Sequence, residues 1–392
     1  MTHVWITTSL LPGLGIAIAA AACVYAWVAL LASCKRLRTF PVDPARDPGA
    51  HPVTVLKPLH GTDPYLYKNL RSFCLQTHPD YQLVFGVRDF EDPAIGVVQQ
   101  LRAEFPARDL TLVVNPVSHG GNPKVSNLIN MLPFAKHDWL VIADSDIRVP
   151  ADYLVRVTAP LSAPDTGIVT CLYRGIAEHG FWSWLGRMFI DDWFVPSVRL
   201  AYTFSPPRYT FGSTIALRRD VLCAIGGFEV LKDALADDYW LGELVRRRHL
   251  NIVVSDLLVG TQVSETGLPS LWTRELRWLR TVRALAPWGF SMTWVCFTSP
   301  VAVLGVLLAH DAWAAGLAAL GIGAQLVLHG RQSRAERPNL PWFEVLLVPL
   351  RDTLLLLQWA TALTGWRVRW HGRLLDSRTS HSAPDLIRHP TT

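Results

Sequence analysis

Two parts of the chain are almost continuously apolar. Residues 10–33 contain no charged side chain and are long enough to cross a bilayer. In the C-terminal third, residues 292–309 and 312–328 are predicted to form a helical hairpin that turns at residues 310–311. The chain is therefore predicted to be an integral membrane protein.

A third apolar segment, residues 343–366, carries Arg351 and Asp352 near its middle. Charges at mid-bilayer depth are costly and usually mark a paired or functional position, so this segment is predicted to be re-entrant or to form two interfacial pieces. The basic cluster at residues 35–38 follows the first span, which by the positive-inside rule places the following domain in the cytoplasm.

Between the membrane segments, short apolar runs alternate with helical periodicity. Strands are predicted at residues 53–57, 81–88, 110–115, 139–143 and 167–173, and helices at residues 65–76, 94–105, 124–132, 236–248 and 270–285. This alternation implies βαβ units, hence an α/β fold with a mainly parallel sheet flanked by transmembrane helices.

The same pattern predicts the domain organisation. It comprises an N-terminal transmembrane helix with a basic stop (1–40), a linker (41–52), a cytoplasmic catalytic domain with interfacial helices (53–290), a C-terminal membrane region of two or three spans (291–370) and a polar tail (371–392). The aromatic segment 181–204 forms either part of the core or a helix in the bilayer interface. Because the domain is attached to membrane segments, the interfacial helix is favoured.

Acidic residues follow two of the predicted strands. Asp144 and Asp146 come directly after residues 139–143, and Asp89 and Asp92 follow residues 81–88. Because parallel strands end at the same edge of a sheet, these carboxylates are expected to face one crevice. Hard oxygen ligands there suit Mg²⁺ or Mn²⁺ carrying a phosphorylated substrate, whereas the alternative is a simple strand-end turn.

Two later segments each allow two readings. Asp237 and Asp238 either cap the helix that they begin or include a general base held at the crevice. The helix at residues 270–285 presents Arg274, Arg277 and Arg280 at helical spacing, which fits either anionic lipid or a diphosphate.

Composition adds two exclusions. The six cysteines form no CxxC pair and no metal spacing, which agrees with a reducing compartment. The net charge of +5 is modest, and because no nucleic-acid-binding signature accompanies it, it is attributed to basic residues beside the membrane.

Taken in order, these motifs resemble membrane-bound glycosyltransferases of the ceramide glucosyltransferase-like branch (families 2 and 21), which includes bacterial hopanoid-associated glycosyltransferases. The resemblance covers about residues 50–285 and rests on Leu56-Lys57-Pro58-Leu59, Asp92, Asn122-Pro123-Lys124, Asp144-Ser145-Asp146, Asp238 and Arg274-Glu275-Leu276-Arg277-Trp278. One departure is Asp146, where the animal ceramide enzymes carry Gly; a complete DxD is closer to the bacterial members.

The resemblance implies a GT-A nucleotide-diphospho-sugar transferase fold and a role for each motif. Asp89 or Asp92 would bind the uracil or ribose, with Lys57 and Lys124 near the nucleotide or diphosphate. Asp144 and Asp146 would hold Mg²⁺ or Mn²⁺. Asp238 would be the general base, Arg274 and Arg277 would stabilise the leaving group, and Trp278 would pack by the sugar or brace the helix.

The implied activity is inverting transfer of glucose or N-acetylglucosamine from a UDP-sugar to a hydroxyl of a membrane lipid. A bacterial inner-membrane location and a hopanoid polyol such as bacteriohopanetetrol are favoured, with ceramide as the alternative acceptor. A non-catalytic membrane scaffold with a degenerate transferase domain is the alternative of another class.

Overall fold

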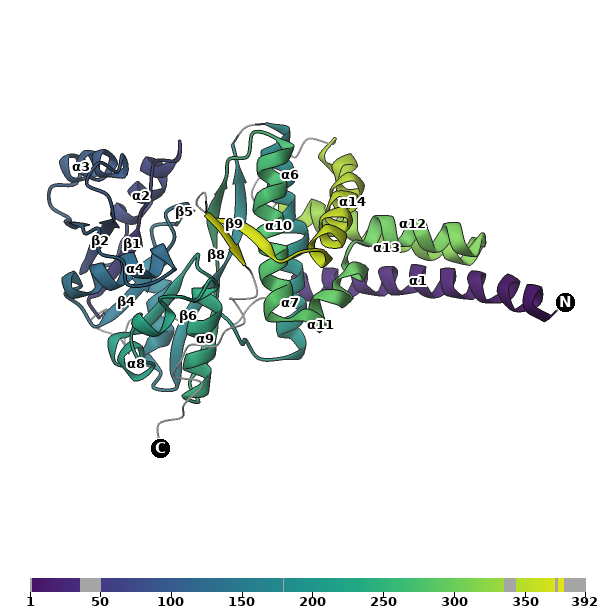
Figure 1. Cartoon of the computed structure of the whole chain (residues 1–392), viewed down its shortest axis with the longest axis horizontal. Helices are drawn as coiled ribbons and strands as arrows, with labels where there is room; N and C mark the ends of the chain where they lie inside the picture. Colours follow the sequence, from purple (N-terminus) through teal and green to yellow (C-terminus); the bar gives the residue numbers. More distant parts are fainter. Residues whose placement is uncertain (1, 36–50, 179, 335–342, 371–372, 377–392) are drawn as a thin grey trace. The chain divides into compact units, whose positions relative to one another are not determined.

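The computed structural model describes residues 2–35, 51–178, 180–334, 343–370 and 373–376 (Figure 1). Its contacts divide the chain into two compact units. The helical unit comprises Met1–Lys35, Ala177–Pro206 and Val263–His381, and the sheet unit comprises Arg36–Ile176, Pro207–Gln262 and Ser382–Thr392. Two segments that the sequence assigned to the catalytic domain, 177–206 and 263–290, thus belong with the helical unit. The predicted linker and polar tail lie mostly outside the described residues.

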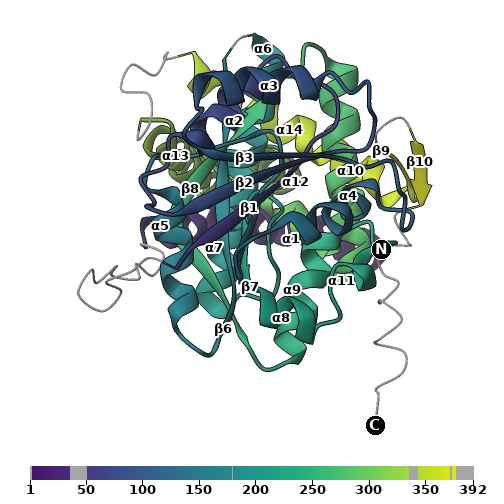
Figure 2. The same cartoon turned by 90° about the vertical axis from the view of Figure 1, so that its left-hand side faces the viewer.

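The sheet unit contains an eight-stranded sheet in the order β3-β2-β1-β4-β7-β6-β8-β5. Its first four strands are parallel, as predicted, and Figure 2 shows three of them side by side. The strands are β1 (Val53–Pro58), β2 (Tyr81–Val87), β3 (Asp109–Val114) and β4 (Trp139–Ile142), connected by the helices α2 (Leu66–Cys74), α3 (Ala94–Glu104) and α4 (Pro123–Met131) with η1 (Leu132–Phe134).

The other half of the sheet contains antiparallel pairs, between β4 and β7, β6 and β7, and β5 and β8. Only β6 (Thr166–Ala177) corresponds to a predicted strand; β5 (Ile147–Arg148), β7 (Ile215–Arg218) and β8 (Asn251–Val263) were not predicted. The helical elements here are α5 (Tyr153–Thr158), η2 (Ala159–Ser162), α8 (Arg219–Ala224), η4 (Glu229–Leu231) and α9 (Asp237–Arg247).

Two apolar clusters cover the two faces of this sheet. Because successive side chains of a strand point to opposite faces, Val55 of β1 joins the cluster that includes α2 and α3, whereas Leu56 joins the one that includes α4, α8 and α9. The central strands are buried on both sides, and their carboxyl ends are therefore held rigidly at one edge.

Among the described residues of the helical unit, three helices are long and apolar enough to cross a membrane: Leu10–Cys34 within α1 (Thr2–Cys34), α13 (Ala312–Arg334) and α14 (Glu344–Leu363). The predicted span 292–309 is wrong as a single helix. Helix α12 (Thr298–Ala309) is bent by 72° from the preceding helical segment Pro287–Cys296, which consists of α11 (Pro287–Met292) and η5 (Thr293–Cys296). Twelve residues rise only about 18 Å, so α12 alone is too short to span.

The prediction for the third apolar segment, residues 343–366, is also wrong. Helix α14 is continuous rather than re-entrant, because its two central charges are paired inside the unit. Arg351 donates to Glu275 at 2.7 Å, and Asp352 accepts hydrogen bonds from Gln325 and from the backbone of Ser299 at 2.7 and 3.0 Å. The expectation that such charges mark a paired position is confirmed.

The aromatic segment 181–204 folds as α6 (Phe181–Met188), a π-helical turn η3 (Phe189–Phe194) and α7 (Val195–Phe204). It contacts α1, α10, α13 and α14, and Arg187, Phe189 and Trp193 are buried. These three residues therefore belong to the core of the helical unit, and the interfacial reading that the sequence favoured is wrong for them, whereas Phe181 and Phe204 at the two ends of the segment are exposed. The unit is completed by α10 (Leu268–Leu285), β9 (Arg367–Trp370) and β10 (Arg373–Asp376).

Helices α1 and α12 approach each other through glycines. A Cβ added at Gly305 would lie 2.7 Å from the backbone nitrogen of Ala19 and from the carbonyl oxygen of Gly15, so the two backbones nearly touch. We expect Gly305→Val to force the helices apart and lower the free energy of unfolding by about 1–3 kcal/mol. Thermal unfolding in detergent measures this, and Gly316→Val is the matched control because nothing lies within 4 Å of its added Cβ. Equal midpoints for the two variants would contradict the prediction.

Candidate active site

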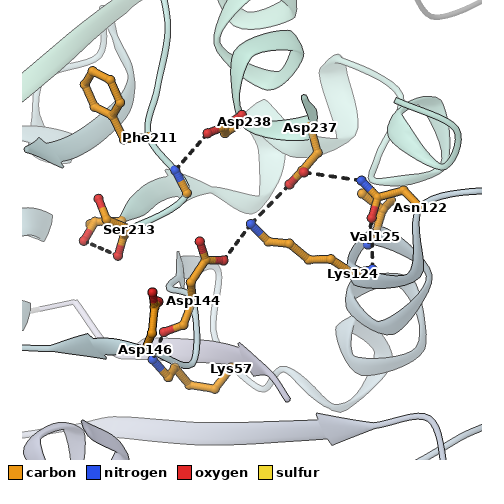
Figure 3. A network of polar contacts seen from close by, with 12 residues as sticks. Lys57, Asn122, Lys124, Val125, Asp144, Asp146, Phe211, Ser213, Asp237 and Asp238 are labelled. Atoms are coloured by element: carbon orange, nitrogen blue, oxygen red, sulfur yellow. Dashed lines mark hydrogen bonds and ion pairs between the residues drawn. The ribbon is translucent and has the colours of Figure 1, made fainter. Parts of the chain in front are cut away.

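The carboxyl ends of β1 and β4 lie next to each other. The parallel register pairs Leu56 with Ile142, so Lys57 lies beside the turn that begins with Asp144. Lys57 is fully buried and its Nζ donates to the backbone oxygen of Asp144 at 2.5 Å. Burial lowers the pKa of Lys57 to about 7, although Asp144 and Asp146 oppose that shift. The lysine thus fixes the backbone of the acidic turn from below (Figure 3).

The two carboxylates of this turn are held differently. Asp146 accepts a hydrogen bond from Thr261 of β8 at 2.8 Å, and burial together with the nearby Asp144 carboxylate raises its pKa to about 6. The side chain of Asp144 is 38% exposed and accepts from the ammonium of Lys124 at 2.7 Å. Thr261 was missed at the sequence level, because nothing in the chain around it signals a contact to residue 146.

Lys124 connects the acidic turn to α9. Its Nζ lies 2.7 Å from Asp144 Oδ1 and 3.3 Å from Asp237 Oδ2, and Figure 3 shows it between the two carboxylates. Burial opposes a charged amine, but the carboxylates of Asp144, Asp237 and Asp238 outweigh it and hold the pKa of Lys124 above its ordinary value.

Asn122 explains why Lys124 is where it is. Its side-chain oxygen accepts from the backbone nitrogens of Lys124 and Val125, which makes it the N-cap of α4 with Pro123 at the first helical position. Its amide nitrogen donates to the backbone oxygen of Ala234 at 2.7 Å. The Asn-Pro-Lys motif therefore starts a helix and docks the loop before α9 at the same time.

The capping reading of the Asp237-Asp238 pair is not supported. Asp237 binds Lys124 and Asn122, and α9 has no side-chain cap hydrogen bond. Asp238 Oδ2 accepts from the backbone nitrogen of Gly212 at 3.1 Å, and Oδ1 from the backbone nitrogen of Tyr239. Burial and the Asp237 carboxylate raise the pKa of Asp238 to about 6, which leaves it ionised at neutral pH and able to accept a proton.

Gly212 lies between the two acidic motifs. Its nitrogen donates to Asp238, and its oxygen accepts from the backbone nitrogen of Asp144 at 3.3 Å. A Cβ at this position would lie 2.8 Å from Asp144 Oδ2, so only glycine leaves this space to the carboxylate. Nothing in the local sequence around Gly212 indicated these partners.

Asp92 and Asp89 lie after β2. Asp92 is buried and accepts from the backbone nitrogens of Gly61 and Ala94 at 3.1 and 2.9 Å, so it fixes the turn after β1 to the start of α3. Asp89 is exposed and accepts from the backbone nitrogen of Glu91. Their contact with a uracil or ribose stays a prediction.

The Arg-Trp motif lies on α10 in the helical unit. Arg274 binds Glu265 at 2.7 Å and lies above the ring of Trp278, which packs against the rings of Phe189 and Phe194 at 5.5 and 6.4 Å. Trp278 is thus packed among aromatic side chains, and its role, beside the sugar or in bracing the helix, stays a prediction. The roles of Arg274 and Arg277 at a diphosphate stay predictions.

Arg280 on the same helix donates to main-chain carbonyl groups. Its guanidinium donates to the backbone oxygens of Thr364 and Arg367 at 3.0 and 2.5 Å. Arg283 likewise donates to the oxygens of Ala362 and Gly365. Both arginines therefore satisfy carbonyl groups at the C-terminal end of α14, where a helix leaves them without intrahelical donors.

The described residues contain no group of three or more His, Cys, Asp or Glu side chains arranged to hold a metal ion. The donor set nevertheless fits Mg²⁺ or Mn²⁺ that a diphosphate helps to bind, since these ions take few protein carboxylates and complete their shells with phosphate oxygens and water. The ammonium of Lys124 beside Asp144 shows that this point already attracts a positive charge.

Residues 14–383 match the family described as glycosyl transferase family 21. The chain belongs to this family. The chain is also 26% identical over 242 residues to ceramide glucosyltransferase 1 of Caenorhabditis elegans, which covers 62% of the chain and 52% of the nematode protein. It is 31% identical over 136 residues to the ceramide glucosyltransferase of Komagataella phaffii strain GS115, covering 34% of the chain and 26% of that protein. The family-21 chain thus spans about half the length or less of these curated relatives.

Among solved structures, the fold is similar to that of a mannosyltransferase from Pyrobaculum calidifontis in complex with GDP-mannose and Mn²⁺. The TM-score is 0.50 at 21% identity, and the match covers 88% of this chain and 99% of the other. This likeness supports the predicted GT-A-type α/β fold.

Proposed function

We propose that this family-21 chain is a membrane-bound glycosyltransferase that moves glucose or N-acetylglucosamine from a UDP-sugar to a hydroxyl group of a membrane lipid. The observation that carries this proposal is the single polar network in which Lys57, Lys124 and Gly212 join the Asp144–Asp146 turn to Asp238. A metal and diphosphate site and a base are then neighbours, as displacement at a sugar carbon requires.

In the proposed reaction, Asp144 and Asp146 hold Mg²⁺ or Mn²⁺, which supplies Lewis-acid stabilisation of the departing diphosphate. Asp238 takes the proton of the lipid hydroxyl while that oxygen attacks C1 of the sugar. The bond from C1 to the diphosphate breaks, UDP leaves, and the configuration at C1 is inverted. Arg277, with Arg274, adds positive charge at the leaving group.

The acceptor separates two forms of the proposal. The names of the curated relatives support ceramide. The complete Asp144-Ser145-Asp146 motif supports a hopanoid polyol such as bacteriohopanetetrol instead, because it sets the chain apart from the animal ceramide enzymes. In both forms the lipid is presented at the cytoplasmic leaflet.

The test is an assay of the full chain in detergent with UDP-glucose or UDP-N-acetylglucosamine, Mn²⁺, and ceramide or bacteriohopanetetrol. We expect stoichiometric UDP release and one added sugar per lipid by mass spectrometry. A ladder of products would indicate polymer synthesis instead. If no combination releases UDP and the nucleotide does not bind, the scaffold alternative holds.

Asp144→Ala is expected to abolish metal-dependent binding of UDP. Loss of an outer-shell partner alone typically costs a metal site 10–100-fold, so loss of a ligand should cost more than about 100-fold. Calorimetric titration with UDP, with and without EDTA, measures the effect. Asp109→Ala is the control, because that carboxylate pairs with the exposed Lys136 and lies outside the polar network. A UDP affinity that is the same in Asp144→Ala as in the wild type, with and without EDTA, would remove the metal role.

A further inference from the structure

The ammonium of Lys124 lies inside a group of carboxylates. It is 2.7 Å from Asp144 Oδ1 and 3.3 Å from Asp237 Oδ2, and its side chain is only 17% exposed. Asp238 adds a third negative charge nearby. The lysine therefore occupies one of the oxygens that a metal ion at Asp144 would use.

The main chain of Lys124 is fixed, whereas its head group is not. Asn122 caps α4 through the nitrogen of Lys124 and donates to Ala234 in the loop before α9, so the start of the helix is anchored on two sides. The ammonium stands at the end of four flexible methylene groups and is held by the carboxylates of Asp144 and Asp237. It can exchange acceptors without any movement of the backbone.

Gly212 lies directly beside the head group of Lys124 and the carboxylate of Asp144. A Cβ at Gly212 would lie 3.2 Å from Lys124 Nζ and 2.8 Å from Asp144 Oδ2, so the absence of a side chain there leaves both groups room. Any larger residue would press the ammonium and the carboxylate together.

The charges of the network match this reading. When all of its groups are ionised, two ammonium groups face four carboxylates, which leaves two negative charges; the groups are Lys57, Lys124, Asp144, Asp146, Asp237 and Asp238. A divalent cation would neutralise this remainder, but on Asp144 it would sit beside the ammonium, and like charges so close repel each other. A diphosphate brings the negative charge that both cations need.

We propose that Lys124 is an internal counter-cation that competes with the divalent metal for Asp144 until a nucleoside diphosphate arrives. On loading, the ammonium would leave Asp144 for a diphosphate oxygen and keep Asp237, and the carboxylate of Asp144 would then be free to hold the metal. Metal binding is then coupled to nucleotide binding, so that the metal binds weakly on its own. The inference rests on the proposed function, because it requires a metal at Asp144.

The experiment measures Mn²⁺ affinity of the full chain in detergent by electron paramagnetic resonance of free Mn²⁺, with and without UDP. Without UDP, we expect Lys124→Met and Lys124→Gln to bind Mn²⁺ at least about tenfold more tightly than the wild type. Coupling between two binding sites usually changes an affinity about 5–150-fold, and the expected effect lies in that range. The gain in Mn²⁺ affinity on adding UDP should shrink by a similar factor in both variants. Lys124→Arg keeps the charge and should stay within about threefold of the wild type, by the same linkage.

Lys136→Met is the matched control. Lys136 also pairs with an aspartate, Asp109 at 2.6 Å, but its side chain is 59% exposed, and its loss should leave Mn²⁺ affinity unchanged. Unchanged or weaker Mn²⁺ binding in both neutral Lys124 variants, with wild-type binding intact, overturns the inference alone. Absence of Mn²⁺ binding in the wild type even with UDP overturns the proposed function instead.

Discussion

Asp238→Asn is expected to lower the turnover number about 10²–10⁴-fold, the usual contribution of a general base. The amide preserves the size of the side chain, and its single oxygen can still accept from one of the two backbone nitrogens that Asp238 binds, those of Gly212 and Tyr239. It cannot take a proton from a lipid hydroxyl. UDP affinity should change little, because Lys124, which we place near the diphosphate, binds Asp144 and Asp237 rather than Asp238.

The matched control for this variant is Asp220→Asn. Asp220 also lies in the first turn of a helix and accepts from the backbone nitrogen of the next residue, Val221, at 2.8 Å, as Asp238 does from Tyr239. Its side chain is 75% exposed and lies outside the polar network. Turnover and UDP affinity are measured for both variants. If Asp238→Asn and Asp220→Asn retain equal turnover, Asp238 is not the base.

The parallel half of the sheet could be predicted because burial on both faces gives a parallel strand a continuous apolar run. Every residue of β2 is buried, and the strand was predicted to within one residue. The acidic turn followed from the same pattern, since Asp144 comes just after the last buried residues of β4. Local sequence thus determined both the strand and the position of its first carboxylate.

The antiparallel half could not be predicted, because its strands lack this signal. Strand β5 has two residues, and the apolar run of β8 is interrupted by Ser255, Asp256 and Gly260. The contacts of the site were hidden for a related reason. Lys124 reaches Asp237 because the loop before α9 is hydrogen-bonded to Asn122. These residues are more than 100 positions apart in the sequence, and the pattern of apolar and polar residues does not indicate contacts over such a separation.

The Arg-Trp motif shows the same limit within the helical unit. The sequence drew attention to its arginines, yet Glu275 is its most buried member, with no exposed surface. Glu275 accepts from Arg351 at 2.7 Å and from Gln358 at 2.8 Å, so it attaches α10 to the middle of α14. Glu275 therefore compensates the buried charge of Arg351 in α14, and this pairing explains why the motif contains a buried acidic residue.

Glu275→Leu is accordingly expected to destabilise the chain severely. It leaves Arg351, 1% exposed, as an uncompensated buried cation, and breaking a buried pair in this way typically costs about 3–5 kcal/mol. Thermal or denaturant unfolding in detergent measures the loss. Glu243→Leu is the control, because Glu243 binds Arg246 and Arg247, whose side chains are 49% and 44% exposed, and such pairs contribute at most about 1 kcal/mol.

A double variant separates the ion pair from other effects of the substitution. Replacing both partners, Glu275→Leu with Arg351→Met, removes the unpaired charge and should recover most of the lost stability, because apolar groups of similar volume can replace a buried pair. If the double variant is as unstable as Glu275→Leu alone, the charge of Arg351 is not what Glu275 compensates. Recovery of stability would instead show that Glu275 attaches α10 to α14 through the charge of Arg351. Glu275 is the acidic residue of the otherwise basic Arg-Trp motif, so its charge would serve the packing of the two helices.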